Sequence, residues 1–91
     1  MNYQDQNRVV THRLMTQVSG EDVFQIFSTD FITDNLSTGG TLYYGPVADK
    51  TKMKAWEETE SANGFFLVKN AIPGMYYYIG GNTGLLNIYY V

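Results

Sequence analysis

Turn-forming residues recur along this chain at short intervals and separate brief segments that are rich in β-branched and aromatic residues. The turn signals fall at 19–20, 37–40, 45–46, 62–64, 73–74, 80–82 and 83–84. Short strands with turns at this spacing are typical of a sandwich or a barrel. Strands are expected near 8–18, 24–32, 41–47, 52–59, 65–69, 76–79 and 85–90. The sequence therefore predicts an all-β fold, a small antiparallel β-sandwich or barrel.

Two turns indicate how consecutive strands connect. Asn63-Gly64 supplies the two positive-φ positions of a tight hairpin. Ile72-Pro73-Gly74 suits a type II turn, with proline second and glycine third. Residues 52–91 are therefore expected to form a C-terminal meander of antiparallel strands. A helical alternative stays open for 21–27, where serine precedes two acids, and for 48–60, which holds good helix formers.

The length of 91 residues points to one domain, spanning 1–91, with residues 1–7 as a polar, flexible arm. Zero cysteines exclude a disulfide, a thiolate metal site and a cysteine nucleophile. The net charge of −3 argues against a nucleic-acid binder. The chain shows no signal-peptide pattern and no apolar run of the roughly 18–20 residues that span a membrane. A soluble protein made in a cytoplasm is expected.

The end of the chain carries no charge. Residues 70–91 contain no charged side chain and hold five of the eight tyrosines. Uncharged strands of high β propensity are aggregation hazards, which proteins protect by pairing or covering them. This tail is expected either to form central strands or to be buried against another subunit. The candidate interface residues are Tyr76, Tyr77, Tyr78, Leu85, Leu86, Ile88, Tyr89 and Tyr90.

Groups for catalysis or metal binding are sparse. His12 is the only histidine, and no carboxylate near it in the sequence would orient it as a base. Asp30 and Asp34, with Asn35 and Ser37, offer oxygen ligands for calcium, but their spacing does not match a calcium loop. Capping of loop backbone is the predicted role of these side chains. No catalytic residue, metal or cofactor is assigned, and the chain is predicted not to be an enzyme.

Three lysines alternate in the middle of the chain. On a strand, Lys50, Lys52 and Lys54 would share one face. That face is interpreted as solvated, and a contact with the acidic segment 21–34 of a neighbouring copy is the alternative.

Residues 34–46, DNLSTGGTLYYGP, followed by Asp49-Lys50-Thr51 and Ala55-Trp56-Glu57, resemble small proteins encoded by tailed bacteriophages. In that family a segment of the form D-N-x-x-T-G-x-T-x-Y-x-G precedes a tryptophan-bearing strand. The resemblance implies a virion structural protein, in a capsid-decoration, head–tail, tail or fibre position. Its partners would be further copies of itself or other virion proteins, in a self-associated or lattice-bound state. Neither nucleic acid nor membrane is expected as a partner.

A second function stays open from the aromatic residues. Trp56, then residues 64–66, then Gly74 ahead of Tyr76-Tyr77 resemble the repeats of β-trefoil lectins. This resemblance implies a small carbohydrate-binding module. Its sugar-stacking residues would be Trp56, Tyr43 and Tyr44.

Overall fold

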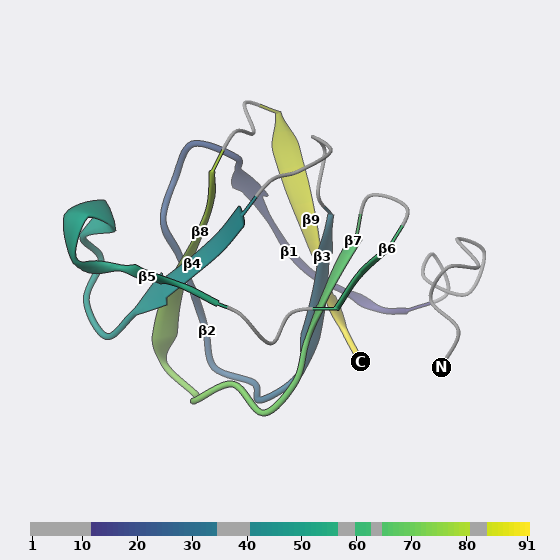
Figure 1. The fold of residues 1–91 in the computed structure, drawn as a ribbon. Helices are drawn as coiled ribbons and strands as arrows, with labels where there is room; N and C mark the ends of the chain where they lie inside the picture. Colours follow the sequence, from purple (N-terminus) through teal and green to yellow (C-terminus); the bar gives the residue numbers. More distant parts are fainter. Residues whose placement is uncertain (1–11, 35–40, 57–59, 63–64, 81–83) are drawn as a thin grey trace.

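The computed structural model describes residues 12–34, 41–56, 60–62, 65–80 and 84–91, which form two antiparallel sheets (Figure 1). The first sheet has the order β1 (Leu14–Ser19), β9 (Leu85–Tyr90), β3 (Phe31–Asp34), β7 (Phe65–Val68), β6 (Glu60–Ala62). The second has the order β2 (Phe24–Ile26), β8 (Met75–Gly80), β4 (Thr41–Gly45), β5 (Lys54–Ala55). A 3-10 turn, η1 (Lys50–Lys52), precedes β5. The predicted all-β, antiparallel sandwich is confirmed.

The uncharged tail forms a central strand in each sheet. β8 lies between β2 and β4, and β9 lies between β1 and β3. Both edges of each strand are therefore hydrogen-bonded to neighbours, which explains why these segments dispense with the charges that protect exposed edges. The predicted C-terminal meander over 52–91 is wrong, because β7, β8 and β9 are not neighbours. Among the described strands of that range, only β6 and β7 pair with each other.

The single strand expected over 24–32 is two strands in opposite sheets. The chain leaves β2 at Phe27 and enters β3 at Phe31. The bend is held by the 70–71 segment. There the Ala71 N–H donates to the Thr29 carbonyl at 2.7 Å, and the Asn70 N–H donates to Asp30 Oδ1 at 3.0 Å. The strand expected over 52–59 is likewise reduced, in its described part, to the two residues of β5.

The turns follow the sequence signals where they are described. The Met75 N–H donates to the Ile72 carbonyl at 3.1 Å, and Gly74 has φ +89°, which confirms the type II turn. Asn63-Gly64 lies outside the described residues, and the strands on its two sides pair with Ala62 opposite Phe65. Neither helical alternative is formed in its described part, apart from the three residues of η1.

The core lies between the sheets and draws on both. Tyr77 is fully buried at its centre, with the Phe24 ring stacked 5.8 Å away and the Phe31 ring edge-on at 5.0 Å. The other side chains there that are less than 2% exposed are Ile26, Leu42, Val68, Ile79, Leu86 and Ile88. Because side chains alternate along a strand, Tyr76 and Tyr78 point away from this core.

A second, smaller apolar cluster lies on the other face of the first sheet. Ile32 pairs with Tyr89 on one side and Leu67 on the other. Ile32 and Leu67 are buried, and Phe65 packs against them. The β3 strand therefore carries apolar side chains on both faces, as expected for the middle strand of a sheet.

Candidate functional site

The structure divides the candidate interface residues into two groups. Tyr77, Leu86 and Ile88 are 0% exposed and belong to the core, so their assignment to an interface is corrected. Strand alternation is the reason, since it turns these three side chains inward and their chain neighbours outward. The side chains that remain accessible are Tyr76, Tyr78, Leu85, Tyr89 and Tyr90.

Tyr43 and Tyr78 form a pair on the outer face of the second sheet. They are opposite each other in the β4–β8 register, with ring centroids 6.2 Å apart and nearly parallel planes. Lys50 Nζ lies 4.0 Å from the Tyr78 ring centroid and donates to the Glu21 carbonyl at 2.5 Å. The face of Tyr78 is thus occupied by a cation of the same chain.

The three residues proposed to stack on sugars do not form one surface. Trp56 and Tyr44 contact each other edge to face, with centroids 4.9 Å apart, and both pack against the core. Trp56 also lies 6.4 Å from the buried Tyr77 ring. Tyr43 projects from the opposite face of β4. The proposed stacking surface is therefore wrong as a set.

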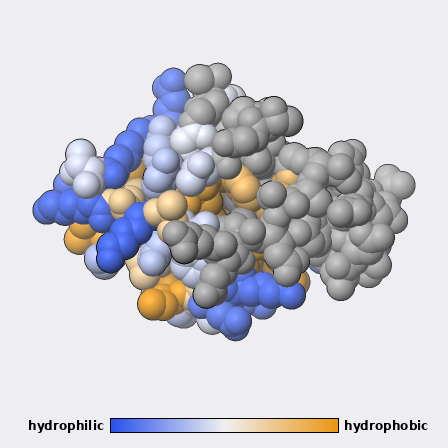
Figure 2. Space-filling model, in the orientation of Figure 1, coloured by the Kyte–Doolittle hydropathy of each residue, from blue (hydrophilic) through white to orange (hydrophobic). Residues whose placement is uncertain are grey.

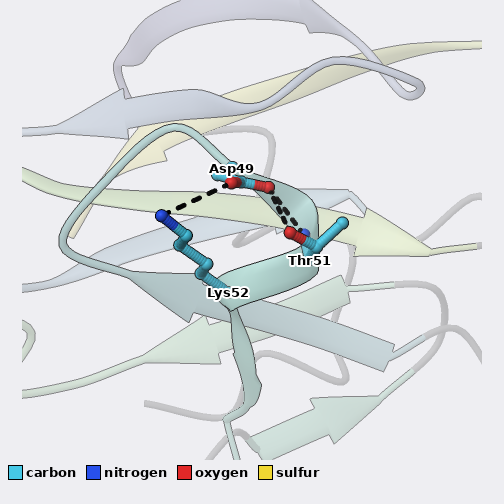
Figure 3. Close-up of polar contacts among 3 residues, drawn as sticks. All are labelled: Asp49, Thr51 and Lys52. Atoms are coloured by element: carbon cyan, nitrogen blue, oxygen red, sulfur yellow. Dashed lines mark hydrogen bonds and ion pairs between the residues drawn. The ribbon is translucent and has the colours of Figure 1, made fainter.

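The lysine stripe is also rearranged. Lys50 and Lys52 belong to η1 and only Lys54 to a strand, so the predicted shared strand face is wrong. Asp49 caps the turn, since its Oδ1 accepts from the Thr51 hydroxyl at 2.6 Å and from the Thr51 N–H at 3.0 Å (Figure 3). These hydrogen bonds, the hydroxyl first, lower the pKa of Asp49. Lys52 Nζ lies 4.0 Å from Asp49 Oδ2, so this polar cluster serves to close a turn.

Hydrophilic residues of the described surface are abundant at the end of the molecule that carries η1 in Figure 1, with hydrophobic residues visible among them (Figure 2). The exposed basic residues Lys50, Lys52 and Lys54 belong to that end.

A groove of about 500 Å³ lies between the edges of the two sheets. Its lining residues are Met15, Thr16, Gln25, Ile26, Phe27, Ser28 and Tyr90. β1 is an edge strand of the first sheet and β2 is an edge strand of the second, so the groove opens along two edges that no other strand of the described residues pairs with. Phe27 is 70% exposed here, which is the largest exposure of any large apolar side chain in the described residues.

The apolar surface extends from the groove onto its rim. Ile72 is 62% exposed in the turn whose Gly74 N–H donates to the Ile26 carbonyl at 2.8 Å. Val91 follows Tyr90 in the chain and is 58% exposed. Sequence reasoning missed this groove, although one signal was present. In residues 24–27, the side chains of Phe24 and Ile26 point inward. Phe27 follows as an apolar residue at a position where the inward–outward alternation predicts an exposed, polar side chain.

Outside the groove, Asp30 has a structural role in a loop. Asp30 holds the Asn70 N–H, which confirms its predicted role as a loop cap, while Asn35 and Ser37 lie outside the described residues. No three side chains of His, Cys, Asp or Glu come together as metal ligands among the residues described. Within the same residues, no helix is long and apolar enough to cross a membrane.

Comparison of the chain with protein-family models, with curated proteins and with solved structures finds no match in any of the three.

Proposed function

We propose that this chain is a non-enzymatic structural subunit of a phage particle, which acts by associating with further copies of itself. The observation that carries the proposal is the apolar groove between two free sheet edges, with Phe27 70% exposed on it. Free strand edges beside exposed apolar side chains are typical of surfaces that bind another protein chain. The resemblance of residues 34–46 to tailed-phage proteins supports the place in a virion.

The energy available at this surface is substantial for a chain of 91 residues. Burial of one large apolar side chain contributes about 1.5–3 kcal/mol relative to leaving it exposed. In a symmetric pair of copies each exposed side chain is counted twice. Coverage of Phe27 in both copies therefore contributes about 2–4 kcal/mol, which offsets part of the cost of bringing two chains together.

Sedimentation velocity over a concentration series tests the proposal. The parent is expected to sediment above the 10.3 kDa of a single chain, with a weight-average mass that rises with concentration. Phe27→Asp is expected to shift the protein to the monomer, because it places a charge in the covered groove.

The matched control is Val47→Asp, since Val47 is also exposed, at 46%, but lies in the connection between β4 and η1. It is expected to associate like the parent. A parent that stays at the mass of one chain at every concentration would overturn the proposed self-association.

A further inference from the structure

We propose that a second copy binds through β1. The β1 strands of two copies pair antiparallel about a two-fold axis at Gln17, which joins the two five-stranded sheets into one. This inference rests on the proposed function, because it names the surface through which the subunits associate.

β1 is the edge strand best suited to pairing. It has six residues, whereas the other edge strands β2, β5 and β6 have three, two and three. Its sequence, LMTQVS, contains no charge and no proline. Proteins normally protect a free edge with those residues, by keeping the strand short or with a β-bulge, and β1 has only the last of these, at its Leu14–Thr16 end.

The backbone of β1 offers the groups that such a pair needs. The Gly20 N–H donates to the Gly84 carbonyl at 2.7 Å, and the register continues as Val18 opposite Leu86 and Gln17 opposite Asn87. Antiparallel hydrogen bonds alternate along a strand, so Val18 bonds to β9 and Gln17 directs its N–H and C=O away from it. A two-fold axis at Gln17 therefore makes a hydrogen-bonded pair of Gln17 with Gln17 of the second copy.

At Ser19, the next residue that faces outward, only the N–H is available for pairing with a second copy. The Ser19 carbonyl already accepts from the Asp22 N–H at 3.0 Å in the turn that ends β1. The Ser19 N–H points outward by the same alternation, toward Met15 of the second copy. A bulge between Leu14 and Thr16 shifts the far end of the strand by about one residue.

Opposite charges at the two ends of β1 favour a second copy as the occupant. Arg13 directly precedes β1, and Glu21 lies in the Ser19–Asp22 turn that follows it, so antiparallel pairing puts the Arg13 end of one β1 strand beside the Glu21 end of the other. Because the axis is two-fold, the charge pair forms twice.

The Arg13 and Glu21 side chains are both exposed, at the two ends of β1. The Arg13 guanidinium lies 4.2 Å from the centroid of the Tyr90 ring, at the rim of the groove. Among the described residues, no ion pair is formed by the Glu21 carboxylate, although Lys50 Nζ donates to the Glu21 backbone carbonyl.

The same symmetry covers the groove. A two-fold axis perpendicular to the joined sheet keeps the second sheets of the two copies on one side of it. The β2 edges then flank the junction, and Phe27 faces the other copy beside the shared β1 strands. The exposed groove and the unprotected strand edge are thus occupied by one partner.

A charge exchange read by native mass spectrometry tests the pairing. Arg13→Glu and Glu21→Arg each place like charges at both ends of the junction, and each variant alone is expected to raise the dimer dissociation constant roughly tenfold or more. A mixture of the two variants restores both opposite-charge pairs, and the heterodimer is expected as a species of its own mass. Lys54→Glu, the same charge change on the edge strand β5, is the matched control and is expected to dimerise like the parent.

A second pair of variants tests the backbone bonds. Gln17→Pro removes the outward N–H at the axis but no bond to β9, and it is expected to abolish the dimer; Gln17→Thr keeps the N–H and should retain it. A parent that dimerises while the charge variants also dimerise alone, or fail to form a heterodimer together, overturns the β1 pairing and leaves the proposed function standing. A parent that is monomeric throughout overturns the proposed function itself.

Discussion

At the scale of single residues, Tyr77 combines favourable aromatic contacts with a buried hydroxyl. Its side chain is fully buried, and within the described part of the chain no group lies within hydrogen-bonding distance of its hydroxyl. A buried polar group without a partner costs about 1–3 kcal/mol. The ring is nonetheless held by aromatic contacts with Phe24 and Phe31.

We expect Tyr77→Phe to stabilise the fold by about 1 kcal/mol, because it removes the hydroxyl and keeps the ring. Urea unfolding followed by fluorescence measures the change. Tyr78→Phe is the control, since Tyr78 lies on the outer face and its change should stay within about 0.5 kcal/mol. A loss of stability in Tyr77→Phe would show that the hydroxyl has a hydrogen-bond partner.

Burial also raises the pKa of Tyr77 to about 12, from an ordinary value of 10.0. Between these two values the unfolded chain loses a proton that the folded chain keeps, so stability falls as the pH rises through this window. Two pH units correspond to about 3 kcal/mol. Urea unfolding at about pH 9 and about pH 11 should show a smaller decline in Tyr77→Phe than in the parent. Equal declines in the two proteins would contradict the buried, neutral phenol.

The sequence shows that Tyr76 and Tyr78 share a face and that Tyr77 takes the other, because alternation is a property of any strand. It does not show which face is inside, since all three residues are the same type. The structure decides this through the register, in which Tyr77 is opposite Phe24 and Tyr44. For this reason the interface predicted from the sequence included Tyr77, which the structure places in the core.

At the scale of elements, the sequence located strands and turns well and their connections poorly. Local residues determine the type II turn at Pro73-Gly74, so its prediction is confirmed. Sheet membership depends on contacts distant in sequence, and β8 and β9 enter different sheets although they are consecutive strands. The run 24–32 appears continuous in composition, yet it is divided by hydrogen bonds from 70–71 that no local pattern reveals.

The 72–75 turn gives a test at this scale. Gly74→Ala is expected to destabilise the fold by about 1 kcal/mol, because φ +89° is unfavourable for any side chain. The loss comes from the backbone alone, since the added Cβ would meet only Phe27 Cε1, at an ordinary 3.8 Å. Thermal melting measures it, and Ile72→Ala, in the same turn but without a positive φ, is the control. Equal melting temperatures for Gly74→Ala and the parent would show that the turn relaxes at no cost.

At the scale of the whole molecule, the position of a strand in its sheet is related to its charge. The uncharged strands β8 and β9 are central, and the lysines of residues 50–54 lie on or beside the edge strand β5. β1 and β2 depart from this arrangement, since both are edge strands without charge. The absence of charge in 70–91 is explained within one chain, and the surface suited to association is the edge formed by β1 and β2.

Association and stability should therefore be linked in the parent protein. If only the folded chain self-associates, the melting temperature rises with protein concentration. Calorimetry of the parent at low and high concentration should show that rise, because burial of Phe27 and pairing of β1 stabilise the native state by mass action.

Phe27→Asp should melt at one temperature over the same concentration range, since its groove no longer binds a second copy. Val47→Asp should follow the parent. A melting temperature independent of concentration in the parent would mean that the exposed edge stays uncovered in solution, and that the free β1 strand is tolerated by a monomer of this size.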